Sequence, residues 1–495
     1  MIKKTDLIKT FFKKSLENLN SKKVFYKYHN KIYSYIDLKN FYNKFLNFLH
    51  KLKNERKKIV IISEKSFEMY ACILSIILSK NIWIPINVNL PKNRIVKILN
   101  ECQADCIIVD QSEDKKYSFI KNYCRKKKII FTDFFKIQKI PINKKIHKKI
   151  DIKDKDTSMI FFTSGSTGEP KGVIISYKGF LNCLFEQNRI LYKNNKNLVF
   201  GDYHDPSFII SLNILFLCFF TKSIISPGID PYESFLPINH IKQNKVNVLI
   251  TVPSTIVRLK NYLKNENFLH KFKLIILCGE PFHLDLYKFM IEKMNSKDIF
   301  NLYGSTELSP WVFSHKCAKK DLKIFDKFKL MPIGKPFRHT KVLLLKNELL
   351  ISGRMLSEGY IKKIENTDKF IKIKNIRWYK TGDISEIHKN YFIIKGRKDR
   401  VVKIKGYRID LTEIEKFLRD INTVQNVICF VKENGDKKSI SCIIQCDKKI
   451  SIDMLITHLK KHVPFYMIPK EFNFLKKFSI NKSGKIDRKN IIKLY

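Results

Sequence analysis

A segment rich in glycine and hydroxyl residues follows a short apolar run and ends in a single lysine. Glycines let backbone N–H groups approach phosphate oxygens closely, and serine and threonine hydroxyls add neutral donors. The lysine supplies a positive charge for a phosphoanion. A P-loop would close with Gly-Lys-Ser/Thr, whereas Glu169-Pro170 separates Gly168 from Lys171 here. A nucleoside triphosphate site is therefore predicted from Thr163, Ser164, Gly165, Ser166, Thr167, Gly168 and Lys171.

Further polar islands interrupt the apolar pattern downstream. Gly279-Glu280 follows an apolar run, where a glycine would let a ligand approach the backbone. The run from Asn301 to Glu307 offers an aromatic face, a hydroxyl and a carboxylate, which suit a purine, a phosphate and a hard cation. Asp383 is an isolated carboxylate suited to sugar hydroxyls, and Arg397 adds a cation. Each island alone is a weak signal, and their order along the chain carries the argument.

In combination, these motifs resemble the adenylate-forming (AMP-binding) superfamily, the family of acyl-CoA synthetases, luciferases and nonribosomal-peptide adenylation domains. The motifs Gly406-Tyr407-Arg408 and Gly484-Lys485-Ile486-Asp487-Arg488 resemble those of carrier-protein-loading adenylation enzymes more than those of CoA ligases. Free-standing D-alanine–carrier-protein ligases are similar in size and layout. The likeness covers nearly the whole chain, because further collinear motifs lie at residues 33–38, 84–87, 347–353, 402–415 and 481–488.

The resemblance implies a reaction in two steps. A carboxylate first attacks the α-phosphorus of ATP, which gives acyl-AMP and pyrophosphate. A thiol then displaces AMP and forms a thioester. The thiol belongs either to the phosphopantetheine of a separate carrier protein or to CoA. Because two anions must meet in the first step, Mg²⁺ and Lys485 are expected to screen their repulsion.

The resemblance also implies a role for each site residue. The segment from Thr163 to Lys171 would hold the β- and γ-phosphates, and Gly279 and Glu280 would line the nucleotide site. Tyr303 would stack on adenine, Thr306 would contact the α-phosphate, Glu307 would hold Mg²⁺ and Asp383 would bind the ribose hydroxyls. Arg397 would support ribose or phosphate, Asp399 would be the hinge of a mobile C-terminal domain, and Lys485 would be catalytic. Arg397 and Asp399 could instead simply pair with each other.

The pocket for the acid, expected to include Tyr303 and Gly304, departs from the family pattern. Amino-acid-activating members carry Phe-Asp-x-Ser, and the gapless alignment places Phe208-Ile209-Ile210-Ser211 there. Ile209 cannot offset the cost of burying an α-ammonium group. A second alignment gives that role to Asp205, and a third compares Tyr203-His204 with the gating aromatic or histidine of acyl-CoA ligases. The substrate is therefore a carboxylic acid or, if Asp205 binds the amine, an amino acid.

The alternation of apolar runs and helical patterns between Lys58 and Asn301 predicts an α/β fold with layered, mostly parallel sheets. Short strands and turns then predict a β-rich subdomain, and an α+β unit follows Arg400. We expect a large N-terminal AMP-binding domain over 1–396 and a small mobile α+β domain over 397–495. The expected strands include 60–62, 107–109, 160–162, 248–250 and 274–277, and the expected helices include 67–78, 90–99 and 411–418.

Composition narrows the function classes. The formal charge of +49 comes from lysines spread over the whole length together with abundant Asn and Ile, so A/T-rich codon usage explains it better than nucleic-acid binding does. The longest apolar stretch, Phe208 to Phe220, is too short to span a bilayer and predicts a buried helix. The 11 scattered cysteines predict buried thiols in a reducing cytoplasm. A non-catalytic nucleotide-binding relative is the remaining alternative.

Overall fold

The computed structural model describes residues 6–50, 52, 56–142, 151–164, 169–192, 196–263, 268–366, 368–435, 437–446, 450–479 and 486–495. The chain forms two compact units. Unit 1 comprises residues 1–88, 102–161 and 172–396, and unit 2 comprises 89–101, 162–171 and 397–495. The predicted domains 1–396 and 397–495 stay a prediction, because unit 2 also takes in two segments of the N-terminal part.

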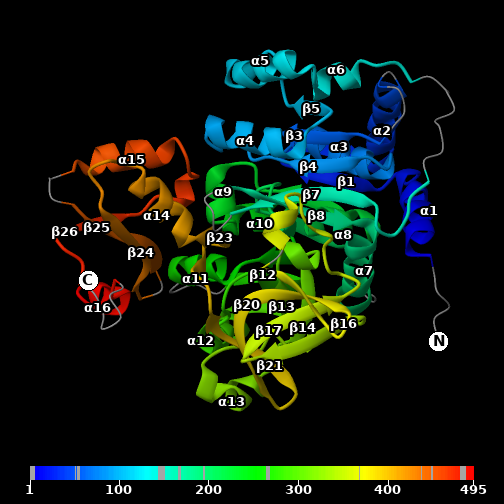
Figure 1. Ribbon diagram of the computed structural model, residues 1–495. Coiled ribbons are helices and arrows are strands. Elements are labelled where there is room, and N and C mark those ends of the chain that lie inside the picture. The colour runs from blue at the N-terminus through cyan, green and yellow to red at the C-terminus, as the bar shows by residue number, and fades with distance from the viewer. Residues whose placement is uncertain are drawn as a thin grey trace. The chain divides into compact units, whose positions relative to one another are not determined.

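A nine-stranded sheet is the largest sheet of unit 1 (Figure 1). Strands β1, β10, β9, β11, β12 and β13 pair in parallel, and the two edges are antiparallel. Parallel strands place their carboxyl ends at one edge of the sheet, where ligands bind in open α/β folds. In spatial order the strands are β15 (Lys335–Pro336), β14 (Trp311–Lys316), β13 (Met294–Gly304), β12 (Phe268–Cys278), β11 (Val248–Thr251), β9 (Val199–Asp202), β10 (Ile224–Pro227), β1 (Val24–Tyr28) and β2 (Lys31–Ser34).

A seven-stranded sheet has a parallel centre as well. Strand β3, in the middle of the parallel part, is mostly apolar and almost wholly buried, as expected for a strand covered on both faces. In order, its strands are β18 (Gly359–Tyr360), β8 (Lys171–Ser176), β7 (Thr157–Thr163), β4 (Ile82–Pro85), β3 (Lys58–Ile62), β5 (Cys106–Val109) and β6 (Ile130–Asp133).

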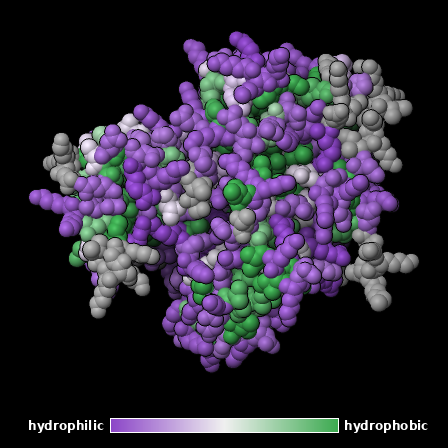
Figure 2. Space-filling view, in the orientation of Figure 1, coloured by the Kyte–Doolittle hydropathy of each residue, from purple (hydrophilic) through white to green (hydrophobic). Residues whose placement is uncertain are grey.

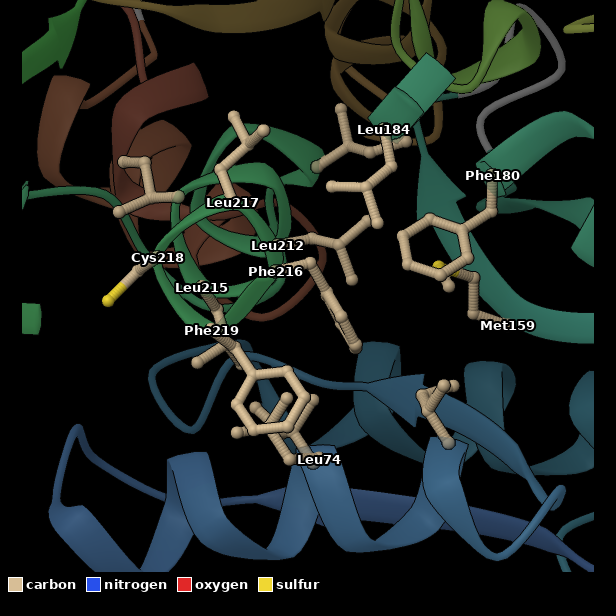
Figure 3. Close-up of a cluster of buried hydrophobic side chains, with 14 of the residues drawn as sticks. Leu74, Met159, Phe180, Leu184, Leu212, Leu215, Phe216, Leu217, Cys218 and Phe219 are labelled. Carbon is tan, nitrogen blue, oxygen red and sulfur yellow. The ribbon is translucent and has the colours of Figure 1, made fainter. Parts of the chain in front are cut away.

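Helix α8 (Ile209–Phe220) lies in the core, and every one of its residues is buried. Figure 3 shows Leu212 and Phe216 of this helix beside Phe180, and Phe219 beside Leu74. Apart from Ser211 and Asn213 its residues are apolar, which suits burial between layers. The other helices of unit 1 are α1 (Leu7–Leu19), α2 (Tyr35–His50), α3 (Phe67–Leu78), α5 (Ser118–Lys127), α6 (Phe134–Gln138), α7 (Tyr177–Gln187), α9 (Pro231–Phe235), α10 (Ile238–Gln243), α11 (Pro253–Tyr262), α12 (Leu284–Lys293) and α13 (Asp321–Ile324).

The β-rich part of unit 1 is a five-stranded antiparallel sheet. Strand β20 pairs with three neighbours and is therefore central. The strands are β16 (Thr340–Leu345), β17 (Glu348–Gly353), β19 (Phe370–Ile373), β20 (Ile376–His388) and β21 (Tyr391–Arg397). The α/β fold with parallel sheets and a β-rich subdomain is confirmed.

Unit 2 is built around a three-stranded sheet in the order β24, β25, β26. Helix α14 packs on β24 and on α15, and the apolar residues of these elements form their own core (Figure 1). The elements from residue 397 onward are β22 (Val401–Ile404), β23 (Tyr407–Asp410), α14 (Leu411–Arg419), β24 (Asn426–Asn434), β25 (Lys437–Gln445), α15 (Ile452–Lys460), β26 (Glu471–Leu475) and α16 (Arg488–Ile492), and α4 (Lys92–Cys102) begins in the earlier segment of the unit.

Hydrophilic side chains cover much of the face shown in Figure 2. Among the described residues, no helix combines the length and the apolar composition that crossing a membrane requires. All 11 cysteines are buried free thiols, in agreement with the sequence-based expectation.

Candidate functional site

The predicted site residues of unit 1 follow the carboxyl ends of neighbouring parallel strands. His204 and Asp205 come after β9, Gly279 and Glu280 after β12, and Tyr303 lies at the end of β13. Strand β11 lies between β9 and β12. One edge of the nine-stranded sheet therefore collects residues that are about 100 positions apart in the sequence.

Tyr303 contacts a predicted site residue from another sheet. Its hydroxyl donates a 2.5 Å hydrogen bond to Oδ2 of Asp383, which lies on β20 of the five-stranded sheet. The Tyr303 ring also makes an edge contact with Phe313, with ring centroids 5.8 Å apart. Thr381 Oγ1 accepts from the Asp383 N–H at 3.0 Å and donates to the Leu349 carbonyl. The aromatic ring and the carboxylate are thus held in a fixed relation before any ligand binds.

The segment after β13 requires a glycine and buries a carboxylate. A Cβ atom on Gly304 would lie 1.9 Å from the Pro310 carbonyl oxygen, so no other residue fits there. Thr306 and Glu307 begin a short 3₁₀ helix. Glu307 is fully buried, and its Oε1 accepts a 2.9 Å hydrogen bond from the Tyr360 hydroxyl. The Tyr360 contact gave no signal in the sequence, because 53 positions separate the two residues.

The residues after β12 shape the same edge of the sheet. Gly279 has a φ of +82°, a conformation that favours glycine. A Cβ atom there would lie 3.5 Å from Val252 and 4.0 Å from Ile210, so the neighbourhood of Gly279 is apolar. Glu280 Oε2 accepts a 2.9 Å hydrogen bond from the Ser254 N–H near the start of α11.

The carboxylate of Asp205 is engaged in local hydrogen bonds. Its Oδ2 accepts from Asn87 Nδ2 at 2.7 Å, and its Oδ1 accepts from the N–H and the hydroxyl of Ser207. Asp205 lines a small cavity together with Trp83 and Asn87. Burial raises its pKa above the ordinary value, although the Ser207 hydrogen bonds oppose the shift.

The two other candidates for the acid pocket carry no charge at neutral pH. His204 Nε2 lies 3.2 Å from the Ile250 carbonyl, and burial lowers the pKa of His204 to about 4. Ile209 is the first residue of α8 and belongs to the apolar core that also contains Tyr303. Asp202, which the sequence did not single out, is fully buried and accepts hydrogen bonds from Tyr70 and Ser211.

The remaining predicted residues belong to unit 2. Ser164 donates a 2.9 Å hydrogen bond to the Arg408 carbonyl, and Thr163 ends β7 while Lys171 begins β8. Arg397 and Asp399 form a bidentate ion pair with distances of 2.7 and 2.9 Å, as one of the two sequence interpretations expected. Gly165, Ser166, Thr167, Gly168 and Lys485 lie outside the described residues.

A single carboxylate at Glu307 fits the chemistry of Mg²⁺. This ion commonly takes one or two protein carboxylates and completes its shell with substrate phosphates and water. Within the part of the chain that the structure describes, no group of three or more His, Cys, Asp and Glu residues is placed to hold a metal ion.

Comparison with known proteins defines the class. Residues 12–361 match the family described as AMP-binding enzyme, and the chain belongs to this family. A D-alanine–D-alanyl carrier protein ligase of Staphylococcus epidermidis is 27% identical over 469 residues, which cover 89% of this chain and 90% of the relative. The predicted family and enzyme class are confirmed: the chain is an ATP-dependent, AMP-forming ligase.

Two solved structures share the fold. The adenylation domain AlmE of Vibrio cholerae, in complex with glycyl-adenosine-5'-phosphate, has a TM-score of 0.85 at 19% identity and covers 99% of this chain and 98% of its own. A mutant o-succinylbenzoate CoA synthetase of Bacillus subtilis has a TM-score of 0.82 at 17% identity, and the match covers 96% of this chain and 97% of the synthetase. Since an adenylation domain and a CoA synthetase fit about equally well, the fold leaves the thiol acceptor open.

Proposed function

We propose that this enzyme activates a carboxylic acid as acyl-AMP and transfers the acyl group to the phosphopantetheine thiol of a separate carrier protein. The observation that carries the proposal is the gathering of His204, Gly279 and Tyr303 at the carboxyl edge of parallel strands, with Asp383 hydrogen-bonded to Tyr303. The proposal that a carrier protein is the acceptor rests on the name of the Staphylococcus relative, 90% of which is covered by the match with this chain. CoA remains the alternative acceptor.

In the first step the acid carboxylate attacks the α-phosphorus of ATP, and pyrophosphate leaves as the P–O bond to it breaks. Tyr303 stacks on adenine, and Asp383 accepts hydrogen bonds from the ribose hydroxyls. Thr306 donates to the α-phosphate, and residues 163–171 bind the β- and γ-phosphates. Lys485 places an ammonium group against the charge that develops, which is the largest kind of catalytic contribution from a fixed group.

Mg²⁺ bound with ATP would screen the triphosphate, and Glu307 is the residue that would hold it. Glu280 and Arg397 support the nucleotide, and Asp399 is the hinge of the C-terminal domain. In the second step the carrier thiol attacks the acyl carbonyl, a C–S bond forms, and AMP leaves with the electron pair of the C–O bond.

We propose a cytoplasmic location, because all the cysteines are free thiols.

The acid is proposed to lack an α-ammonium group. Asp205 already accepts hydrogen bonds from Asn87 and Ser207, and Ile209 offers no charge at the start of α8. The amino end of a helix also carries partial positive charge, which disfavours a cation nearby. A buried ammonium without a partner carboxylate would be strongly unfavourable.

A screen of acid-dependent pyrophosphate release tests the proposal, with amino, hydroxy, aryl and fatty acids as substrates. The best acid is then used for thioester formation with a holo carrier protein and with CoA. We expect Lys485→Ala to lower ATP–pyrophosphate exchange by about 10²–10³-fold, the effect of losing one preorganised donor. An unchanged exchange rate in this variant would refute the role of Lys485, and no release with any acid would favour a non-catalytic relative.

A further inference from the structure

Glu415 is a buried carboxylate that connects three separate parts of unit 2. It lies on α14, its side chain is 1% exposed, and it accepts hydrogen bonds at both oxygens. Arg400 Nη1 donates to Oε2 at 2.6 Å, and the Cys429 N–H donates to Oε1 at 2.7 Å. Arg488 donates twice, from Nη1 to Oε1 at 3.0 Å and from Nη2 to Oε2 at 3.1 Å.

The surroundings of Glu415 favour the ionised form of its carboxyl group. Burial alone would raise the pKa of its carboxyl, but the hydrogen bonds from Arg400 and Arg488 and the positive charge of Arg400 hold this pKa below its ordinary value. Charge-assisted and bidentate hydrogen bonds of this kind fix geometry as well as energy. At neutral pH the two guanidinium groups are therefore tied to one ionised carboxylate.

Glu415 and Arg400 also supply hydrogen-bond partners to the edge strand of the three-stranded sheet. Strand β24 is an edge strand, and Cys429 faces Cys442 of β25 across the ladder. The Cys429 N–H donates to Glu415, while its carbonyl accepts a 2.7 Å hydrogen bond from Arg400 Nη2. Buried backbone groups on an edge need such partners. Glu415 and Arg400 are thus fixed to the sheet and not only to each other.

Arg488 anchors the chain that follows position 485. It is the first residue of α16, and Asp487 donates from its N–H to the Ser479 carbonyl at 2.8 Å. Ile491 of α16 packs with Ile428 and Ile443 of the sheet. On the other side of the Glu415 carboxylate, Arg400 follows Asp399, the proposed hinge, by one position.

We propose that Glu415 is a positioning residue for Lys485: through Arg488 and Arg400 it fixes the segment after the lysine to the segment after the hinge. The inference rests on the proposed role of Lys485 in acyl-AMP formation. A misplacement of about 1 Å at a reacting centre can cost about 10²-fold in rate. The thiol-transfer step does not use Lys485 in this scheme, so loss of the anchor should affect the first step selectively.

The experiment compares Glu415→Gln and Arg488→Gln with a matched control, Glu471→Gln. Glu471 forms a 2.9 Å ion pair with Lys432 in the same unit. The substrate is the acid with the highest rate in the screen above. Two reactions are measured: ATP–pyrophosphate exchange, and acyl transfer to pantetheine from the separately supplied acyl-adenylate of that acid. Thermal unfolding of each variant reports on folding.

We expect Glu415→Gln and Arg488→Gln to lower kcat for exchange about 10–100-fold, with KM for ATP within about threefold of the parent enzyme. Transfer from the supplied acyl-adenylate should stay within about threefold, Arg488→Lys should be intermediate, and Glu471→Gln should match the parent. An unchanged kcat for Arg488→Gln, or an equal loss in both reactions, overturns the inference. Lys485→Ala distinguishes failure of the proposed function from failure of this inference. If Lys485→Ala retains exchange, the proposed role of Lys485 is wrong. If Lys485→Ala loses exchange while the Glu415 and Arg488 variants retain it, only the positioning role of Glu415 is wrong.

Discussion

The hydrogen bond between Tyr303 and Asp383 shows how the site is organised at the scale of single residues. The two side chains come from different sheets, yet they lie 2.5 Å apart at Oη and Oδ2. In the proposed function this ring and this carboxylate bind the adenine base and its ribose together. Preorganisation of this kind lowers the entropic cost of binding.

Asp383→Ala should weaken ATP binding through its ribose. We expect KM for ATP to rise about 10–100-fold, because a charged acceptor of a hydrogen bond contributes about 1.5–3 kcal/mol. The measurement is ATP–pyrophosphate exchange with ATP and with its 2'- and 3'-deoxy analogues. The parent enzyme should prefer ATP, and the variant should lose this preference. A variant that still discriminates against the deoxy analogues would show that another residue binds the ribose.

Ile209→Asp should change the class of acid that is activated. A carboxylate at the start of α8 would give an α-ammonium group a partner and would also suit the positive end of the helix. We expect amino-acid-dependent pyrophosphate exchange to increase at least about 10-fold relative to the desamino acid of the same length. Ile209→Asn, which has the same shape as Asp without its charge, is the matched control. If the parent enzyme already prefers the amino acid, the proposed acid class is wrong.

At the scale of elements, strong hydrophobic patterns predicted the positions of helices along the chain well. The helix expected over 67–78 is α3 (Phe67–Leu78), and the buried helix expected over 208–220 is α8 (Ile209–Phe220). Contacts between distant elements could not be predicted in the same way. Glu415 and Arg488 stand 73 positions apart, and no periodic signal links them. Sequence patterns encode the face that an element buries, while ion pairs across elements depend on the finished packing.

Helix α8 provides a test of the core at this scale. Phe216 is fully buried, and its ring packs against that of Phe180 in an edge-to-face arrangement, with ring centroids 4.8 Å apart (Figure 3). Phe216→Ala should lower the free energy of unfolding by about 3–5 kcal/mol, because it leaves a cavity in a close-packed core. Chemical denaturation measures this loss. Ile364→Ala, at a side chain that is 80% exposed, should change it by less than about 0.5 kcal/mol, and a similar loss in both variants would contradict the packing argument.

At the scale of the whole molecule, buried histidines make stability depend on pH. His240 is 1% exposed, and its Nδ1 lies 2.9 Å from the Tyr203 hydroxyl. Burial, together with the charge of His29, lowers the pKa of His240 to about 4 from an ordinary value of 6.5, and burial does the same for His204. Between pH 4 and 6.5 the unfolded chain therefore binds more protons at these positions than the folded chain does.

Stability should consequently fall as the pH is lowered from 6.5 towards 4, since protonation favours the state that binds more protons. Each histidine can contribute a slope of up to about 1.4 kcal/mol per pH unit in this window. Thermal unfolding midpoints measured across the window should drop steeply for the parent enzyme and less steeply for His240→Gln. His339→Asn, at an exposed position, should retain the parent slope. An unchanged slope in His240→Gln would mean that folding does not lower the pKa of His240, because only a pKa that differs between the folded and unfolded states contributes to the slope.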